Sequence, residues 1–296
     1  MRMKISARYC ISIVCLLFVQ PAISLAADED GGCDHHVAPW LDPSSGEVVQ
    51  AEQVLARLAD SRIVLLGEAH TTMAHHRWQL YMLSALHSRQ SNLVVGFEML
   101  PRRVQSSLDD WSGGTLTEEE FLEQAEWQKV WGYDPDLYLP LLHFVRLNRL
   151  PAISLNIDRE LVSQVSQQGW QALDESQRMG LSDPAPASDA YRDSLGPLFA
   201  YKQILAATEE DEDVPEPDLD EIMDCDAFSN FVDAQLSWDR AMAEALAAAH
   251  RRDPKATVVG IVGRGHLEYG YGIPHQLADM GIDDVDVLLP LNATAT

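Results

Sequence analysis

The chain alternates short, continuously apolar segments with longer segments in which apolar residues recur at helical spacing. Residues 63–66 and 93–97 are apolar runs, and the segment 71–87 between them repeats apolar side chains every three or four positions. An apolar run bounded by a turn signal is typical of a strand buried on both faces of a parallel sheet. The order strand, helix, strand within one crossover length predicts that the two strands are parallel neighbours.

The same alternation continues towards the C-terminus. Further strands are expected at 151–155, 256–262 and 285–291. Further helices are expected at 52–59, 102–111, 118–127, 139–148, 158–167, 226–250 and 273–280. We therefore predict an α/β fold with a mainly parallel central sheet flanked by helices, together with a helical subdomain.

The first residues predict export. Residues 1–26 begin with basic side chains, continue as a short apolar run and end in small residues, a pattern typical of a secretory signal peptide. We expect an exported protein, periplasmic in location, with or without attachment to a membrane. Of the four cysteines, Cys33 and Cys225 remain after removal of this segment, and an exported compartment permits either a disulfide between them or two free thiols.

A change of pattern divides the remaining chain. The segment 169–226 is polar and helical, shows no strand pattern, and contains an acidic loop at 208–226. The predicted divisions are a signal peptide at 1–26, an N-terminal arm at 27–50, an α/β domain at 51–168 and 227–296, and a helical insertion at 169–226. The formal net charge of −25 argues against a nucleic-acid partner, which requires clustered Lys and Arg against phosphate.

Ionisable side chains follow three of the predicted strands. Glu68 and His70 follow the first strand, Glu98 follows the second, and Arg264 with His266 follows the fourth. Because the carboxyl ends of parallel strands meet at one edge of a sheet, we expect these groups to converge. On an extended chain Arg264 and His266 also face the same side.

This set of side chains fits two kinds of chemistry. Glu68, His70 and His266 are suitable ligands for a divalent metal ion. The set of Glu68, His70, Glu98 and His266 is equally suited to general acid and base catalysis. A scaffold without chemistry is the third interpretation.

Two other features are candidates for ligand binding. His75 lies one helical turn from Gln79 and is placed to face the same crevice. Tyr269 and Tyr271 lie in a glycine-rich loop after the fourth strand, and a tyrosine phenolate is a known axial ligand of haem iron. Packing of either tyrosine within its own loop is the alternative.

At these positions the chain resembles the ChaN-like haem-binding uptake family, within the Tiki/erythromycin-esterase superfamily. The matching segments extend over about residues 60–280. They are Leu65-Leu66-Gly67-Glu68-Ala69-His70, His75-His76 with Gln79-Leu80, Gly96-Phe97-Glu98-Met99-Leu100-Pro101, Gln105 with Leu108-Asp109, Trp131-Gly132, Leu155-Asn156, Trp238-Asp239 with Met242-Ala243, and Gly263-Arg264-Gly265-His266-Leu267-Glu268-Tyr269-Gly270.

The resemblance implies an exported, often lipid-anchored protein of haem or iron uptake. It implies haem as cofactor, bound between two subunits through a tyrosine, so that the chain forms a homodimer on haem binding and meets a membrane-associated uptake partner. Tyr269 matches the motif best, with Tyr271 as the alternative. Arg264, His266 and His75 are the candidates for contact with the haem propionates.

The superfamily also implies a second function. Some of its members resemble esterases and proteases, and Glu68, His70, Glu98 and His266 resemble their active-site positions. A metal-dependent hydrolase is therefore the alternative to a haem-binding protein.

Overall fold

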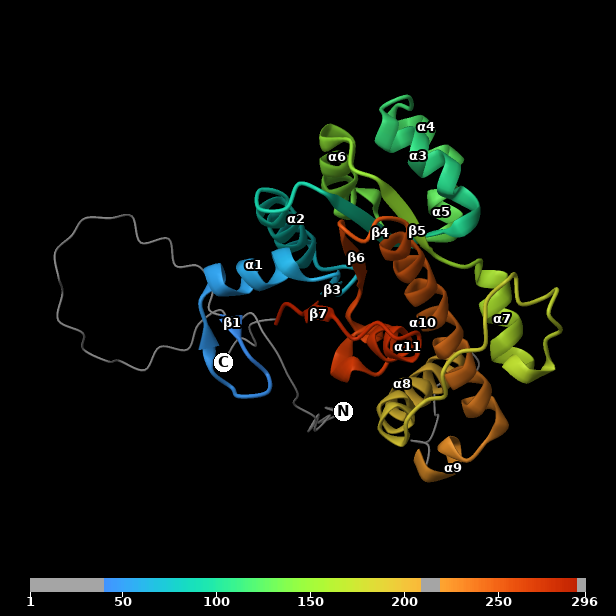
Figure 1. Cartoon of the computed structure of the whole chain (residues 1–296). Helices are drawn as coiled ribbons and strands as arrows, with labels where there is room; N and C mark the ends of the chain where they lie inside the picture. The colour runs from blue at the N-terminus through green and yellow to red at the C-terminus, as the bar shows by residue number, and fades with distance from the viewer. Residues whose placement is uncertain (1–39, 209–218, 292–296) are drawn as a thin grey trace.

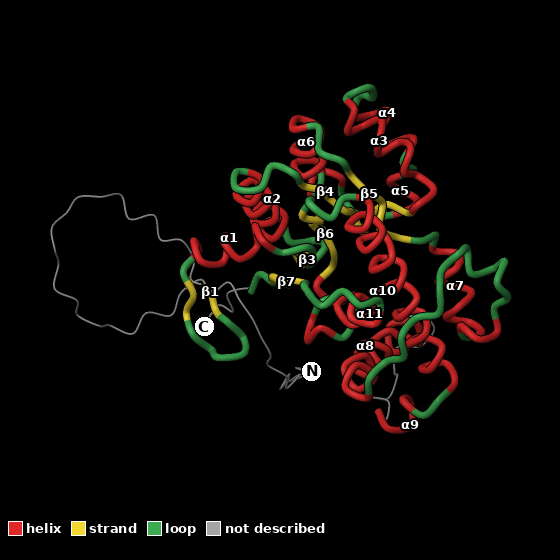
Figure 2. The backbone as a smooth tube through the Cα atoms, viewed as in Figure 1, coloured by secondary structure: helices red, strands yellow, loops and turns green. Residues whose placement is uncertain are grey.

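The computed structural model describes residues 40–208 and 219–291. Five strands form one parallel sheet in the order β5-β4-β6-β3-β7, which confirms the predicted α/β fold. Figure 2 shows the strands at the centre of the molecule with helices around them. The strands are β3 (Ile63–Glu68), β4 (Leu93–Pro101), β5 (Ala152–Asn156), β6 (Thr257–Gly263) and β7 (Val285–Leu288).

Helices connect the strands of the sheet. A short antiparallel pair, β1 with β2, precedes the first helix. In chain order these other elements are β1 (Trp40–Leu41), β2 (Val48–Val49), α1 (Ala51–Asp60), α2 (Met73–His87), α3 (Gln105–Gly113), α4 (Glu118–Gln124), α5 (Trp127–Val130), α6 (Leu139–Asn148), α7 (Arg159–Gln168), α8 (Asp189–Thr208), α9 (Leu219–Met223), α10 (Asp226–Arg252) and α11 (Ile273–Asp279).

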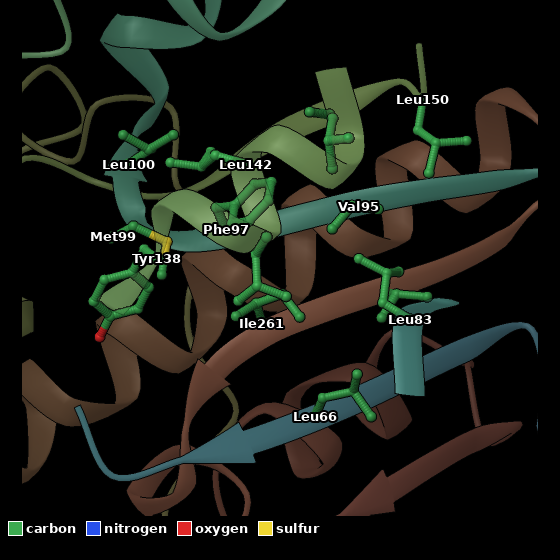
Figure 3. Close-up of a cluster of buried hydrophobic side chains, with 14 of the residues drawn as sticks. Leu66, Leu83, Val95, Phe97, Met99, Leu100, Tyr138, Leu142, Leu150 and Ile261 are labelled. Carbon is green, nitrogen blue, oxygen red and sulfur yellow. The ribbon is translucent and has the colours of Figure 1, made fainter. Parts of the chain in front are cut away.

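Alternate side chains of each strand enter two separate cores, one on each face of the sheet. In β3, Val64 and Leu66 pack with residues of α1, α2, α3, α4 and α6. Ile63 and Leu65 point to the opposite face, where α10 and α11 supply the apolar partners. Figure 3 shows part of the first core, with Leu66 and Phe97 among the packed side chains. A sheet covered on both faces explains why its strands read as continuous apolar runs.

The long helix α10 joins the sheet to a second group of helices. Its C-terminal half packs on the sheet through Met242 and Leu246, and its N-terminal half packs with α8 through Phe228 and Phe231. Figure 1 shows α8 and α9 beside the N-terminal half of α10, away from the sheet. The described residues of the segment 169–226 contain helices and no strand, while the division into domains stays a prediction.

Two strand boundaries differ from the expected ones. The sequence predicts a strand that ends at Glu98 and is broken by Pro101, but β4 continues to Pro101 and shifts register against β5 between Phe97 and Pro101. A proline cannot donate to the ladder, so it is tolerated beside such an irregularity. β7 ends at Leu288 rather than at residue 291, because Pro290 has no N–H to extend the pairing.

Several expectations concern residues outside the described part. The signal peptide at 1–26, Cys33 and residues 209–218 of the acidic loop all lie there, so export and the disulfide stay predictions. Within the described part, Cys225 caps α10, because its Sγ accepts a hydrogen bond from the Phe228 N–H at 3.4 Å. None of the described helices is long and apolar enough to cross a membrane.

Candidate functional site

The carboxyl ends of β3, β4 and β6 bring the predicted acid and base side chains together. Glu68 is the last residue of β3, and Glu98 lies in β4 one position after the last pair of its ladder with β6. His266 follows β6, which pairs in parallel with both of these strands. Topology therefore places the groups at one edge, as expected for parallel strands.

Glu68 and His70 form a tight pair. His70 Nδ1 donates to Oε1 of the buried Glu68 carboxylate at 2.6 Å, and the Tyr138 hydroxyl donates to the same oxygen at 3.2 Å. Burial lowers the pKa of His70, but the hydrogen bond to Glu68 and the charge of Glu98 outweigh burial and raise this pKa above its ordinary value.

The second oxygen of Glu68 has a different environment. Oε2 is buried and has no hydrogen-bond partner among the described residues. Buried polar atoms are almost always hydrogen-bonded, so an exception requires an explanation such as a ligand, an ion or a proton-transfer role. Glu68 Oε2 is therefore the atom at this edge that is best suited to a partner from outside the chain.

His266 lies between two buried carboxylates. Its Nδ1 donates to Asp239 Oδ1 at 2.7 Å, and its Nε2 is 3.5 Å from Glu98 Oε1. Burial alone would lower the pKa of His266, but Asp239 and Glu98 outweigh it and raise this pKa to about 10. His266 is therefore an imidazolium at neutral pH.

Glu98 has the complementary shift. Burial raises the pKa of the Glu98 carboxyl group. The charge of His266 and the hydrogen bond to it have a larger effect in the opposite direction, so the pKa of Glu98 is below its ordinary value. The Gly263 N–H also donates to Glu98 Oε2. Glu98 and His266 thus form a largely buried ion pair at the end of the sheet.

Gly263 is the point where the two pairs approach each other. A Cβ at this position would lie 2.7 Å from His70 Cε1 and 3.4 Å from Glu98 Oε2. Real Cβ contacts are not as short as the first of these distances, so the glycine leaves the space that His70 occupies beside Glu98. We call Glu68, His70, Glu98, Asp239 and His266 the His–carboxylate cluster.

Residues near the start of α2 hold the segment that carries Glu68 and His70. Ala69 N donates to His75 Nδ1 at 2.9 Å, and His76 Nε2 donates to the His70 backbone carbonyl at 3.1 Å. Gln79 Nε2 donates to a backbone carbonyl of β3 at 2.8 Å. His75 and His76 are both buried, so they hold the segment that carries His70 and do not face an open crevice.

Three contributors to the cluster were not predicted as site residues from the sequence. Asp239 comes from the middle of α10, Tyr138 precedes α6, and Tyr191 donates its hydroxyl to Asp239 Oδ2 at 2.8 Å. The sequence signal for Asp239 is an acidic residue on the apolar face of a long helix, three positions before Met242. A buried carboxylate in that position requires partners, which here are His266 and Tyr191.

Among residues 40–208 and 219–291, no group of three or more His, Cys, Asp or Glu side chains is arranged to hold a metal ion. The set of Glu68, His70 and His266 as metal ligands therefore stays a prediction. The hydrogen bonds of the two histidines already engage one ring nitrogen each, at Glu68 and Asp239.

The tyrosine loop lies beside this cluster and has a different exposure. Tyr269 is 50% exposed, and its ring stacks on that of Tyr271 with centroids 5.3 Å apart. Tyr271 in turn packs against Tyr191, with centroids 5.9 Å apart. Tyr269 has φ of 59°, an uncommon value for a non-glycine residue that marks a tightly constrained loop.

The extended geometry assumed for Arg264 and His266 is wrong. Residues Arg264–His266 form a 3₁₀ turn, so the two side chains separate. Arg264 Nε donates to Glu268 Oε1 at 2.6 Å, and Arg264 is partly exposed on the side of the tyrosine loop. His266 instead turns inward to Asp239.

Tyr269 lines a groove of about 780 Å³ between the tyrosine loop, β7 and the N-terminal elements. Most of its lining is apolar. The apolar side chains are Trp40, Leu41, Val49, Val54, Leu58, Leu267, Val285, Val287, Leu288 and Leu289. This volume is within the usual range for small-molecule sites.

The chain is thus an α/β protein with an open parallel sheet, polar groups at the carboxyl ends of its inner strands, and a groove lined by Tyr269 along the edge strand β7. The chain belongs to the haem-binding uptake family of the Tiki superfamily, ChaN, whose model matches residues 54–277. The prediction of this family is confirmed. A comparison with curated proteins finds no significant match.

Two solved structures are similar to this chain, and the first of them shares its fold. ChaN of Campylobacter jejuni, described with cofacial haem binding, has a TM-score of 0.65 at 19% identity, over 86% of this chain and 91% of that chain. An erythromycin esterase mutant, EreC, in its open conformation has a TM-score of 0.46 at 14% identity, over 80% of this chain and 72% of that chain.

Proposed function

We propose that this chain binds haem, with the Tyr269 phenolate as the ligand of the iron. The proposal rests on one observation above all: Tyr269 is a half-exposed tyrosine at the edge of an apolar groove in a chain of the ChaN family. Ferric iron accepts a phenolate as axial ligand, and a porphyrin ring requires an apolar surface next to it.

The propionates require cations near the same groove. Of the three candidates, Arg264 is partly exposed next to Tyr269, whereas His266 and His75 are held inside by Asp239 and by the Ala69 N–H. We therefore assign propionate binding to Arg264, which would exchange its contact with Glu268 for a haem carboxylate. Charge-assisted pairing of a guanidinium with a carboxylate is geometrically favourable.

The exposure of Tyr269 also supports haem binding between two copies of the chain. A single groove would leave one face of the haem in water, and a second subunit would cover it. We propose a homodimer on haem binding, in an exported, periplasmic protein that delivers haem or iron to a membrane-associated uptake partner.

A hemin titration of the purified protein tests the ligand. We expect a shifted Soret band that saturates for the native protein, with a clear loss of affinity in Tyr269→Phe. Tyr271→Phe is the matched control, because Tyr271 stacks under Tyr269 and packs against Tyr191. An unchanged spectrum and affinity in Tyr269→Phe would refute ligation by Tyr269.

A second function is favoured by a separate observation. Glu68 Oε2 is buried without a partner, next to His70 and close to the charged His266–Glu98 pair. A carboxylate base beside an imidazolium acid is suited to hydrolysis, with or without a divalent metal ion. Glu68, His70, Glu98 and His266 are the groups that would carry this activity.

Hydrolysis of p-nitrophenyl acetate, with and without added zinc, tests the second function. We expect Glu68→Gln to abolish any activity, whereas Tyr269→Phe retains it. Absence of turnover, or equal turnover in the native protein and Glu68→Gln, would refute the hydrolase function. Neither result would bear on the proposal of haem binding.

A further inference from the structure

Three tyrosines form a continuous row between the tyrosine loop and the His–carboxylate cluster. The rings of Tyr269 and Tyr271 stack with centroids 5.3 Å apart and planes inclined by 25°, and the rings of Tyr271 and Tyr191 have centroids 5.9 Å apart. Centroid distances of about 4.5–7 Å are usual for aromatic rings in direct contact. We call Tyr269, Tyr271 and Tyr191 the tyrosine row.

The row begins at the surface of the protein and ends in its interior. Tyr269 is 50% exposed, Tyr271 is partly buried, and Tyr191 is 3% exposed. Tyr191 belongs to the apolar core between α8 and α10, and Tyr271 packs against the same core. An electron that leaves Tyr191 therefore has two ring-to-ring contacts to cross before it reaches Tyr269.

The inner end of the row has a proton acceptor. The Tyr191 hydroxyl donates to Asp239 Oδ2 at 2.8 Å, and Asp239 Oδ1 accepts from His266 Nδ1 at 2.7 Å. Burial and the charge of Asp239 raise the pKa of Tyr191, so its phenol is protonated at neutral pH. Loss of an electron makes a phenol strongly acidic, so oxidation is favoured where a base already accepts a hydrogen bond from the hydroxyl. Asp239 therefore makes Tyr191 suited to one-electron oxidation.

The backbone of the tyrosine loop fixes this geometry. Gly272 follows Tyr271, and a Cβ at Gly272 would lie 2.7 Å from Asp239 Oδ1 and 2.5 Å from the His266 carbonyl oxygen. Real Cβ atoms do not approach other atoms so closely, so a glycine is required for the loop to come this near to Asp239. The loop and the buried carboxylate are thus in contact through the backbone as well as through the aromatic rings.

We propose that the tyrosine row carries an oxidising equivalent from haem at Tyr269 to Tyr191 when the haem-loaded protein meets hydrogen peroxide. The inference rests on the proposed ligation of haem by Tyr269. Hydrogen peroxide takes two electrons from the haem group and two protons from solvent, and leaves as two molecules of water. Tyr191 then returns one electron through Tyr271 and Tyr269. Its proton moves to Asp239 Oδ2, which leaves a neutral tyrosyl radical at Tyr191 and a haem group that is one electron short.

Freeze-quench electron paramagnetic resonance of the hemin-loaded protein, after an equimolar addition of hydrogen peroxide, tests the proposal. We expect a radical signal that narrows when the tyrosines are ring-deuterated. Tyr191→Phe should lose this signal and retain the Soret band of bound hemin. Tyr201→Phe is the matched control and should keep the full signal, since Tyr201 is on the same helix, is 58% exposed and is outside the row.

A second variant interrupts the row without removing its inner end. Tyr271→Phe leaves the hydrogen bond between Tyr191 and Asp239 in place, and it replaces the middle ring by one that is much harder to oxidise. The radical should therefore form more slowly in Tyr271→Phe than in the native protein. Its formation should also slow in D2O, because the proton of Tyr191 leaves with the electron.

The possible failures of the two proposals are distinguishable. If hemin binds and the native protein forms no tyrosyl radical, or forms the same signal as Tyr191→Phe, the role of the tyrosine row is overturned and haem binding stands. Equal losses of signal in Tyr191→Phe and Tyr201→Phe would overturn it as well. Absence of a Soret shift in the native protein would refute the proposed haem site, and the role of the row with it.

Discussion

Side chains of the His–carboxylate cluster carry charges that burial alone would disfavour. His266 is largely buried, with 13% of its side chain exposed, and yet charged, because Asp239 and Glu98 lie on its two sides. An isolated charge in this position would be expelled or neutralised. The charges of the cluster therefore depend on one another, and substitution of one member or a change of pH should affect the others.

Removal of the charged His266 side chain should test this dependence. His266→Ala leaves Asp239 and Glu98 buried without their counter-charge, and breaking a buried pair in this way costs about 3–5 kcal/mol. We expect a loss of this size in the free energy of unfolding at pH 7, measured by urea denaturation.

The pH dependence of this loss has a definite sign. The folded-state pKa of His266, about 10, is above its ordinary value of 6.5, so its stabilising effect is complete below 6.5 and is lost as the pH rises towards 10. The difference between native protein and His266→Ala should therefore shrink between these values. A difference that is constant from pH 6 to pH 10 would contradict a charged His266.

Tyr269 provides a second prediction at the residue scale. Partial burial raises the pKa of its phenol, and Glu268 raises it further. Because iron must displace the phenolic proton, hemin affinity should increase with pH from 6 to 9 in the native protein. Tyr269→Phe should show a smaller dependence, and identical pH profiles would argue against proton release from Tyr269. Soret titrations at several pH values measure both.

At the scale of elements, the sequence predicts the parallel sheet. It predicts only part of the arrangement of side chains at the carboxyl edge of that sheet. Apolar runs locate all five strands, and topology then places Glu68, Glu98 and His266 at the same edge. The turn at Arg264–His266 was not predicted, because alternation assumes an extended chain. Asp239 was not predicted as a site residue, because its contact with His266 depends on how α10 packs.

The glycines after β6 give a test of this arrangement. A Cβ at Gly263 would meet the His70 ring, whereas a Cβ at Gly265 has open space around it. Gly263→Ala should displace His70 and cost about 1–3 kcal/mol of unfolding free energy, as overpacking usually does. Gly265→Ala is the matched control and should show no comparable loss. Equal stability of the two variants in thermal or urea unfolding would contradict the close approach at Gly263.

At the scale of the whole molecule, two regions of the fold differ in their exposure and in the polarity of their side chains. The carboxylates of the His–carboxylate cluster are buried and His70 is its most exposed member, while the Tyr269 groove lies between β7 and the N-terminal elements. Family membership supports haem as the ligand of the chain, and the open groove is the better place for a group as large as a porphyrin. If haem occupies that groove, the role of the His–carboxylate cluster is either to stabilise the edge of the sheet or to catalyse a reaction.

Haem binding should change the oligomeric state. If a second subunit covers the exposed face of the haem, light scattering should report a monomer without hemin and a dimer with it. Tyr269→Phe should remain a monomer under the same conditions. A monomer that retains bound hemin would contradict the shared site but not ligation by Tyr269.

A crystal structure of the hemin complex tests the central claim most directly. We expect the iron bonded to the Tyr269 phenolate oxygen, the porphyrin against the apolar wall at Leu267 and Leu289, and a propionate at Arg264. Iron bonded to His70 or His266, or haem placed away from the tyrosine loop, would contradict the account.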